Sequence, residues 1–177
     1  MKDLASRHGR IDSVVHCAGV LATLPIQTLR HEHFQSMMQV NVEAAFGLIK
    51  GFRQKAVRGT NGAVVLLSSC AGLKGSPGFS LYGATKAALM ALVRSSAMEL
   101  ARESIRVNAI AAAIVETEMT RQLWKNLSED QVEAIRAAHP LGFGKPEDVA
   151  NAIAFLVGPT SRWITGTTMI VDGGFTA

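Results

Sequence analysis

Residues 62–86, GAVVLLSSCAGLKGSPGFSLYGATK, contain the pattern that decides the fold. The run from Gly62 to Ser69 is almost continuously apolar, which is typical of a parallel strand covered on both faces. A glycine-rich loop from Cys70 to Phe79 follows, and residues 80 to about 103 are rich in alanine and leucine, which favours a helix. A buried strand followed by a loop and a long helix indicates an α/β protein with a parallel sheet.

The same alternation of strand and helix patterns continues on both sides of this stretch. A long helix is predicted upstream, at residues 30 to about 58, where apolar residues recur at near-helical spacing. The full set of predicted elements is strands at 11–17, 62–69, 105–111 and 167–171 and helices at 30–58, 80–103, 117–138 (one or two, divided near Asn126 to Ser128) and 146–158. We expect one domain over residues 1–177, with about four parallel strands flanked by helices.

Composition narrows the class of protein. Apolar residues make up 48% and charged residues 18%, as in a soluble globular protein. The longest apolar run, Val107 to Val115, is too short to cross a bilayer, and the N-terminus lacks the apolar core of a signal peptide. Cys17 and Cys70 lie beside apolar stretches and favour small buried side chains in a reducing compartment. We therefore expect a cytoplasmic protein with no membrane partner and no metal site.

The net charge of +4 raises the question of a polyanionic partner. The clearest basic cluster is Arg53, Lys55 and Arg58, near the predicted end of the 30–58 helix, where cations favour the helix dipole. A solvated helix end explains this cluster better than nucleic-acid binding, which stays a minor alternative. No nucleic-acid partner is expected.

Four residues suggest proton-transfer chemistry. Tyr82 and Lys86 are four positions apart in a predicted helix, so their side chains share one face. A neighbouring ammonium favours the phenolate and would lower the pKa of the tyrosine toward a range useful for acid-base catalysis. Ser69 ends the preceding strand, and Asn41 lies in the earlier helix. Each residue also has an ordinary explanation: a surface contact for the pair, a turn residue for the serine and a packing amide for the asparagine.

A longer series of motifs favours the chemical interpretation. Ser69 stands thirteen residues before the only tyrosine of the chain. The motifs that follow in order are IRVNAI at 105–110, VETEM at 115–119, PLG at 140–142, KPEDVA at 145–150, TG at 165–166 and VDGG at 171–174. This ordered series covers nearly the whole chain and resembles the classical short-chain dehydrogenase/reductase family, particularly its 3-oxoacyl-carrier-protein-reductase-like members.

The resemblance implies a catalytic tetrad of Asn41, Ser69, Tyr82 and Lys86. Tyr82 would exchange a proton with the substrate oxygen while hydride moves to or from a nicotinamide, and Ser69 would hydrogen-bond the same oxygen. Lys86 would lower the pKa of the tyrosine and hold the nicotinamide ribose, and Asn41 would fix a water that leads from Lys86 toward solvent. Positioned donors of this kind stabilise the charge that develops on the oxygen.

The same resemblance implies contacts to NAD or NADP. The residues it places beside the cofactor are Ala18, Gly19, Tyr82, Lys86, Val115 and Thr117, the last at the nicotinamide carboxamide. The substrate would be a small carbonyl compound or secondary alcohol. The region from Thr117 to Pro140 corresponds to the helices that cap the substrate in the family. Met119 and Trp124 could line a pocket there, although packing against the sheet explains them better.

Several features of the family's cofactor site are changed or missing. No G-x-G-x-x-G motif is present, and Gly142-Phe143-Gly144 precedes a Lys-Pro pair rather than opening a strand-to-helix turn. Residues 16–19 read His-Cys-Ala-Gly where the family has an Asn-Ala-Gly motif, and Ala112-Ala113 replace a Pro-Gly pair. Only fifteen residues precede His16, so we expect a truncated Rossmann-type fold, its C-terminal part. Cofactor binding would be impaired or completed by another chain.

Three functional interpretations follow. The first is an oxidoreductase of the family, and the second is a non-catalytic remnant that acts as an oligomeric assembly module. The third is that Met1 is not the native start and the sequence is a fragment or short product of a longer reductase. In the truncated fold the 11–17 strand becomes a sheet edge, and an apolar edge invites pairing with another chain. We therefore expect a homo-oligomer that uses this edge or the helices at 30–58 and 80–103.

Overall fold

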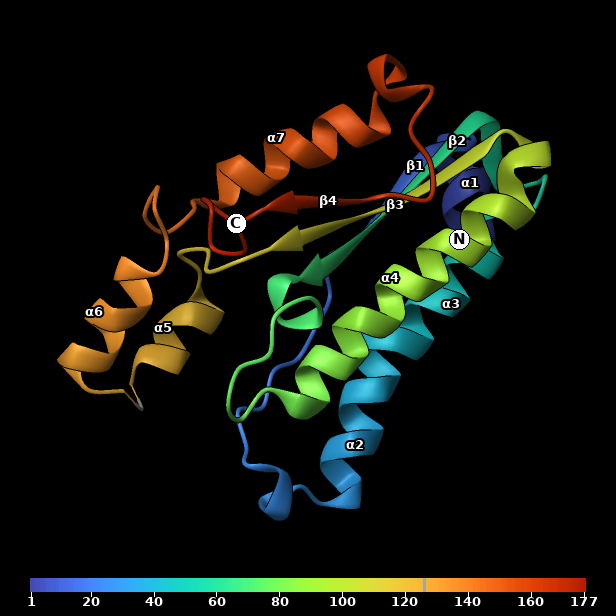
Figure 1. The fold of residues 1–177 in the computed structure, drawn as a ribbon. Helices are drawn as coiled ribbons and strands as arrows, with labels where there is room; N and C mark the ends of the chain where they lie inside the picture. The colour runs from blue at the N-terminus through green and yellow to red at the C-terminus, as the bar shows by residue number, and fades with distance from the viewer. Residues whose placement is uncertain (126) are drawn as a thin grey trace.

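Four parallel strands form the centre of the molecule, in the order β1-β2-β3-β4 (Figure 1). The computed structural model describes residues 1–125 and 127–177. The elements in chain order are α1 (Lys2–His8), β1 (Ile11–His16), η1 (Ile26–Thr28), α2 (His31–Met38), η2 (Gln39–Glu43), α3 (Ala44–Phe52), β2 (Arg58–Ser69), η3 (Cys70–Gly72), α4 (Ser80–Leu100), η4 (Ala101–Glu103), β3 (Ile105–Ala112), α5 (Glu118–Trp124), α6 (Glu129–Ala137), α7 (Pro146–Val157), η5 (Pro159–Ser161) and β4 (Thr168–Val171). The predicted α/β class with about four parallel strands is confirmed.

Strand β2 has helices on both of its faces, as its continuous apolarity predicts. Val64 and Leu66 point to one face and belong to the cluster that contains residues of α3 and α4. Val65, between them in the sequence, points to the other face and packs with residues of α7. This alternation is the normal geometry of a strand, and Figure 1 shows α7 on one side of the sheet and α3 and α4 on the other.

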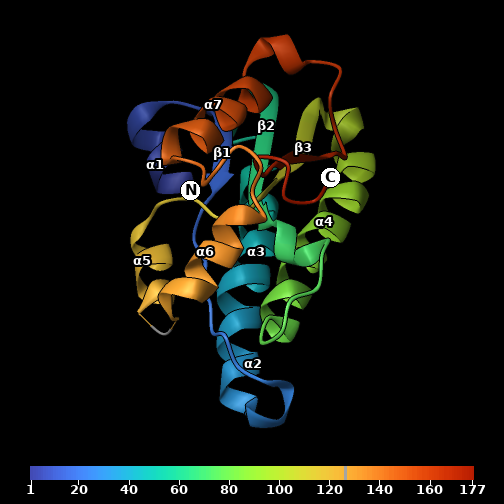
Figure 2. The same cartoon turned by 60° about the vertical axis from the view of Figure 1, so that its left-hand side comes forward.

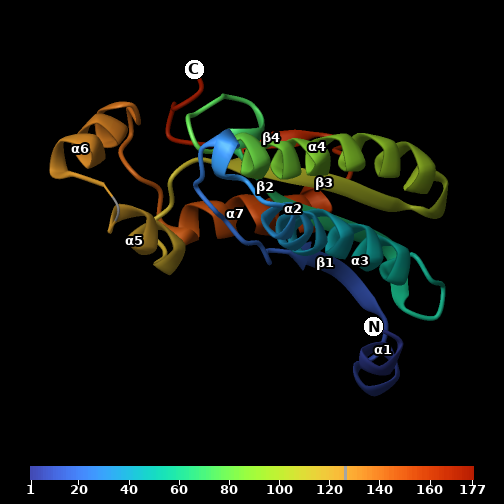
Figure 3. The same cartoon turned by 90° about the horizontal axis from the view of Figure 1, so that it is seen from below.

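Helix α4 contributes the largest share of the core beneath the sheet. Leu89 and Val93 are fully buried and pack in the same cluster as Phe52 of α3 and Val107 of β3. Burial of each such side chain contributes roughly 1.5–3 kcal/mol relative to an exposed position. Figure 3 shows α3 and α4 side by side along the sheet. This packing fixes the first turns of α4 relative to the end of β2.

The predicted helix at 30–58 ends earlier than the sequence suggests. It runs from His31 through a π-helical turn, η2, to Phe52, and Arg58 already begins β2. The error has a physical cause: Val57 is fully buried, and its carbonyl accepts a hydrogen bond from Ile11 in β1, so the chain turns into the sheet here. The π-turn places Asn41 in the interior, and such turns occur often at functional sites.

Helices α5 and α6 lie beyond the carboxyl ends of the strands. Figure 1 shows them past the arrowheads of β3 and β4, and Figure 2 brings this end of the molecule forward. Two short helices are thus present where the sequence predicted one or two. The predicted division near Asn126 to Ser128 includes residue 126, which lies outside the described residues. A capping box joins Ser128 and Gln131 at the start of α6.

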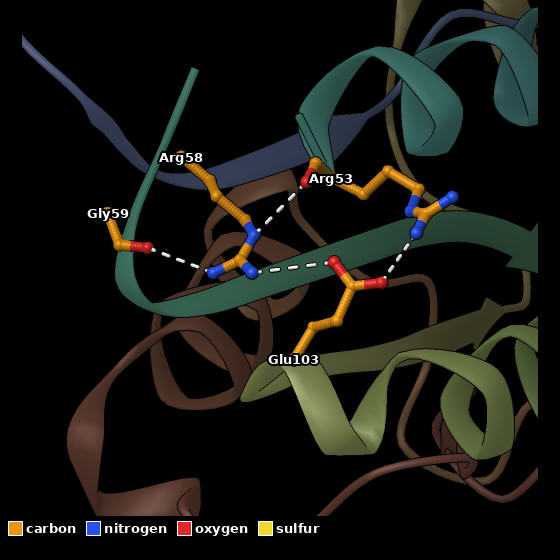
Figure 4. A network of polar contacts seen from close by, with 4 residues as sticks. All are labelled: Arg53, Arg58, Gly59 and Glu103. Atoms are coloured by element: carbon orange, nitrogen blue, oxygen red, sulfur yellow. Dashed lines mark hydrogen bonds and ion pairs between the residues drawn. The ribbon is translucent and has the colours of Figure 1, made fainter. Parts of the chain in front are cut away.

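The basic cluster at the end of α3 is organised around one carboxylate. Figure 4 shows Glu103 between Arg53 and Arg58, with Oε1 2.6 Å from Arg53 Nη2 and Oε2 3.4 Å from Arg58 Nη2. Arg58 also donates to the carbonyls of Arg53 and Gly59. The prediction of a simple helix end is wrong for Arg58, because this residue belongs to β2 and connects α3, β2 and η4.

Strand β1 is an edge strand in the part of the chain that the structure describes, as predicted. Its Val15 side chain is 36% exposed, whereas His16 is buried. Helix α1 lies at the amino end of β1, far from α5 and α6 (Figure 3). Among the described helices, none is both long and apolar enough to span a membrane.

Candidate active site

The predicted catalytic residues come together where β2 meets the start of α4. Ser69 is the last residue of β2, Tyr82 lies in the first turn of α4, and Lys86 lies one turn later. Asn41 approaches from the π-turn of the neighbouring helix. In parallel α/β sheets, ligands bind in the crevice outside the carboxyl ends of the strands, which is where these four side chains lie.

Ser69 and Tyr82 line one cavity of about 590 Å³. Burial raises the pKa of the Tyr82 phenol above its ordinary value, and a hydrogen bond with Ser69 opposes this shift. The expected lowering of the Tyr82 pKa by Lys86 is wrong for this structure. The Lys86 Nζ atom lies 5.5 Å from the centroid of the tyrosine ring, and desolvation of the phenol outweighs other influences on its pKa. Tyr82 is therefore a phenol at neutral pH.

Lys86 is buried, with 4% of its surface exposed. Its Nζ atom donates to the carbonyl of Leu67 at 2.8 Å, and its own carbonyl accepts a hydrogen bond from Ser68 at 2.7 Å. Burial lowers the pKa of the ammonium to about 8, and the nearby Cys17 thiol opposes this shift. The lysine is therefore still mostly protonated at neutral pH, but it gives up its proton more readily than an ordinary lysine.

Asn41 is fully buried and connects three parts of the site. Its Oδ1 accepts from the backbone N–H of Val20 at 2.8 Å, and its Nδ2 donates to the Val20 carbonyl and to Thr85 Oγ1, both at 3.0 Å. Thr85 in turn donates to the carbonyl of Tyr82 at 2.8 Å. Asn41 thus fixes the loop after β1 against the helix that carries Tyr82 and Lys86. Its predicted role toward a water stays a prediction.

Apart from Tyr82 and Lys86, the predicted cofactor-binding residues lie in the segments that follow β1 and β3. Ala18 is exposed just past β1, and a Cβ added to the next residue, Gly19, would lie 3.4 Å from both Asn41 Oδ1 and Lys86 Nζ. Val115 pairs with Gly144 through a short parallel bridge. Thr117 caps the start of α5, where its hydroxyl accepts a hydrogen bond from Thr120. Gly142–Gly144 lies beside residues 114–116 and precedes α7, as its position before Lys-Pro suggests.

The two cysteines differ in their surroundings. Cys70 is buried, as predicted, and burial raises the pKa of its thiol to about 12. Cys17 is exposed, so the prediction of a buried side chain is wrong for it. The strand ends at His16, one residue before Cys17, and the cysteine consequently lies outside the sheet interior, where the sequence had placed it. His16 is buried, and neither ring nitrogen has a hydrogen-bond partner among the described residues.

The rest of the cavity wall is mostly apolar. Met119 lines it, whereas Trp124 stacks on Phe143, with ring centroids 5.3 Å apart. Sequence reasoning missed most of the wall residues, among them His139 and Phe175. The first is a histidine at the end of a stretch of small and charged residues, and the second follows the VDGG motif. The complete set of lining residues is Leu21, Thr23, Ser69, Cys70, Ala71, Lys74, Ser76, Pro77, Phe79, Tyr82, Ala113, Ile114, Met119, Thr120, Leu123, Leu127, Gln131, Ala134, Ile135, Ala138, His139 and Phe175.

Comparison with known proteins gives a consistent set of relatives. A family model described as enoyl-(acyl carrier protein) reductase matches residues 1–176. The 3-oxoacyl-(acyl-carrier-protein) reductase of Thermotoga maritima is 34% identical over 175 residues, which are 98% of this chain and 70% of the relative. The same enzyme of Rickettsia felis is 36% identical over 173 residues, with 97% and 70% covered.

Solved structures agree with the sequence relatives. A short-chain type dehydrogenase/reductase from Mycobacterium ulcerans superposes with a TM-score of 0.90 and 31% identity, over 98% of this chain and 63% of the other. A structure of ElxO with NADP bound superposes with a TM-score of 0.84 and 31% identity, over 98% and 70% of the two chains. The sequence therefore spans about two thirds of the length of these proteins.

Proposed function

The chain belongs to the short-chain dehydrogenase/reductase family, and from this we propose that it is an oxidoreductase that transfers hydride between NAD or NADP and a carbonyl compound or secondary alcohol. The observation that carries the proposal is that Ser69 and Tyr82 lie together in the wall of one mainly apolar cavity. A carbonyl oxygen placed between these two hydroxyls would meet a proton donor and a second hydrogen-bond donor together.

The side chains around Lys86 suit the nicotinamide end of a dinucleotide. The Nζ atom uses one hydrogen bond, to Leu67, and so keeps donors for ribose hydroxyls. Gly19 leaves open the space next to Nζ that a side chain would fill. Lys86, Tyr82, Ala18, Gly19, Val115 and Thr117 are the residues that we propose to hold this end. When bound, the nicotinamide supplies or accepts the hydride.

Each of the four polar residues of the site has a separate proposed role in proton transfer or in positioning. In reduction, the Tyr82 phenol donates its proton to the substrate oxygen, and its raised pKa keeps that proton in place until the oxygen becomes basic. Ser69 donates a hydrogen bond to the same oxygen. Lys86 would hold the ribose and would stand next to the phenol as a cation, and Asn41 positions the loop and helix that carry these groups.

Binding of the whole dinucleotide is proposed to be weak in these 177 residues or completed by another chain, since the sequence has no G-x-G-x-x-G turn to receive the pyrophosphate. Loss of those contacts would weaken binding by several factors of ten, each worth about 1.4 kcal/mol. Calorimetric titration with NAD(H) and with NADP(H) tests this. Micromolar binding by the purified chain alone would contradict it.

The catalytic assignment is tested by turnover of medium-chain methyl ketones with NADH and NADPH. Tyr82→Phe is expected to lower kcat by about 10²–10⁴-fold with an unchanged circular dichroism spectrum, because it removes only the transferable proton. Ser80→Ala, at an exposed position in the same helical turn, is the matched control and should retain full activity. Measurable turnover by the unmodified protein that Tyr82→Phe retains in full would refute the assignment.

A second candidate function, an oligomeric assembly module, is favoured by the exposed apolar surface. Besides the β1 edge, the side chains of Phe34, Phe46 and Met98 on α2, α3 and α4 are 51%, 55% and 83% exposed. Surfaces of this kind mark sites of association. Sedimentation at micromolar concentration tests this part: a homo-oligomer without turnover favours the module, and a strict monomer contradicts it. Cytoplasmic localisation is part of both proposals.

A further inference from the structure

The cavity beside Tyr82 is lined mainly by apolar residues and by few charged groups. Among the lining residues that the structure describes, Lys74 is the one with a permanent charge, and no carboxylate faces the space. The Lys74 ammonium is held at the rim, where it donates to the carbonyl of Phe175 at 2.9 Å and lies 4.2 Å from the centroid of that ring. The wall formed by α6, the residues that follow it and the C-terminal segment contains two further polar residues, Gln131 and His139.

The ring nitrogens of His139 can be assigned from their neighbours. Nδ1 lies 2.7 Å from the carbonyl oxygen of Ile135, and a carbonyl oxygen can only accept, so Nδ1 carries a proton. In the neutral ring, Nε2 is then a hydrogen-bond acceptor. This atom is buried and has no hydrogen-bond partner among the described residues, although the residue is only 4% exposed. Buried polar atoms are normally paired, which makes this one an exception that requires a partner.

The orientation of the His139 ring is fixed on several sides. Its face stacks on Phe175, with centroids 4.6 Å apart and planes 13° from parallel, and its edge meets Phe143 at 5.3 Å. Phe175 is itself held by a turn in which Asp172 accepts from the backbone N–H groups of Gly174 and Thr176, at 2.9 and 2.8 Å. The ring that carries the unpaired nitrogen is therefore held in place, and His139 belongs to the same cavity wall as Ser69 and Tyr82.

We propose that the substrate carries, on a mainly apolar body, a hydroxyl or amide N–H that donates a hydrogen bond to Nε2 of His139. This inference rests on the proposed function, because it takes Tyr82 and Ser69 as the site of the reacting carbonyl. The apolar walls accept the body of the substrate, and the absence of a carboxylate among the described lining residues disfavours a cationic one. His139 is thus a specificity-determining residue at a distance from the reacting atoms.

The first test is NMR of the histidine ring nitrogens in protein labelled with isotopically enriched histidine. The chain has five histidines, and the His139 signals are assigned by their loss in His139→Phe, which keeps an aromatic ring in the stack. We expect the tautomer with the proton on Nδ1, and an upfield shift of Nε2 when medium-chain methyl ketones with a hydroxyl on the chain are added. The parent ketones should leave Nε2 unmoved. A proton on Nε2, or no response to any hydroxyketone, overturns the inference.

The second test is the ratio of kcat/KM for a hydroxyketone and its parent ketone. The unmodified protein should prefer the hydroxyketone by about tenfold or more, because a site built to pair a polar group rejects the analogue that lacks it. His139→Phe should lose this preference, so that the ratio falls to about one, and His139→Gln, whose amide oxygen can accept a hydrogen bond, should keep part of it. Thr23→Val changes another polar wall residue and should keep all of it.

The two tests separate this inference from the proposed function. A shift of Nε2 on binding, without turnover, would support the recognition site while the oxidoreductase proposal fails. Turnover with no preference, and with no movement of Nε2, would keep the oxidoreductase and overturn the recognition site. A preference that persists in His139→Phe would also overturn it, because the discriminating group would then lie elsewhere.

Discussion

Replacement of Lys86 by methionine should change how the free energy of unfolding depends on pH, and the structure gives the size of this change. The ammonium is 4% exposed and has one hydrogen bond, to Leu67. Burial lowers its pKa from 10.5 to about 8, so the folded protein holds this proton less tightly than the unfolded chain does. Methionine has a similar length and no charge, so Lys86→Met removes the titrating group and keeps most of the packing.

The sign of the pH effect follows from proton binding. Below about pH 8 both states of the unmodified protein hold the Lys86 proton, and above 10.5 neither does. Between these values the unfolded chain binds more protons than the folded protein, so the free energy of unfolding rises with pH. The pKa values differ by about 2.5, and one pH unit corresponds to about 1.4 kcal/mol, which gives a rise of about 3 kcal/mol. In Lys86→Met this rise is absent.

The assay is urea unfolding at a series of pH values, followed by tryptophan fluorescence for both proteins. Near neutral pH the variant should be as stable as the unmodified protein or up to about 2 kcal/mol more stable. It is relieved of a buried charge, but it leaves the Leu67 carbonyl unpaired, at a cost of about 1–3 kcal/mol. The difference between the two proteins should then move by about 3 kcal/mol in favour of the unmodified protein as the pH is raised through the window.

Other groups that titrate at alkaline pH are common to both proteins and cancel in the difference. Lys50→Met, at an exposed position on α3, controls for the loss of one positive charge. A stability difference that stays constant from about pH 8 to 10.5 would show that Lys86 is not desolvated in the folded protein. The same result would also contradict the conclusion that Lys86 gives up its proton more readily than an ordinary lysine.

Three further predictions concern the scaffold of the site. Leu66→Ala, in the fully buried centre of β2, should lower the free energy of unfolding by about 2–5 kcal/mol with an unchanged urea m-value, and a loss below about 1 kcal/mol would contradict the assigned packing. Gly72→Ala should destabilise the protein by about 1–3 kcal/mol in the same assay, because the added Cβ would lie 2.8 Å from the backbone nitrogen of Ala87, which α4 holds in place. Glu103→Gln should lower the melting temperature more at low salt than at high salt, because the Glu103 carboxylate forms ion pairs with Arg53 and Arg58 at a partly exposed position. A decrease in melting temperature that does not depend on salt would show that the loss of these ion pairs does not cause it.

The sequence predicted the elements whose pattern depends on local composition. The continuous apolarity of residues 62–69 correctly predicted a strand with helices on both faces, and Pro146 correctly marked the first residue of α7. The end of the helix that contains Phe52 was not predictable, because residues 53–57 have no helix-breaking glycine or proline and the turn there depends on burial of Val57 against the sheet. Tertiary contacts decided this boundary.

In the candidate site, too, features that depend on local sequence could be predicted and features that depend on tertiary contacts could not. The four-residue spacing of Tyr82 and Lys86 follows from helix geometry and could be predicted. The exposure of Cys17 could not, because it depends on β1 ending one residue earlier, at His16. The partner of Asn41 was also hidden, since the π-turn that directs its side chain toward Val20 and Thr85 has no distinct sequence pattern.

For Tyr82, the sequence correctly predicted Lys86 as a neighbour but wrongly predicted that the charge of Lys86 would determine the pKa of the phenol. A charged neighbour favours the phenolate, but desolvation favours the neutral phenol, and the degree of desolvation depends on the finished fold. Burial acts on both members of the pair and in opposite directions: it raises the pKa of the phenol and lowers that of the ammonium to about 8. The lysine then gives up its proton before the tyrosine does, so Tyr82 keeps its phenolic proton at neutral pH, and the proposed reduction depends on that proton.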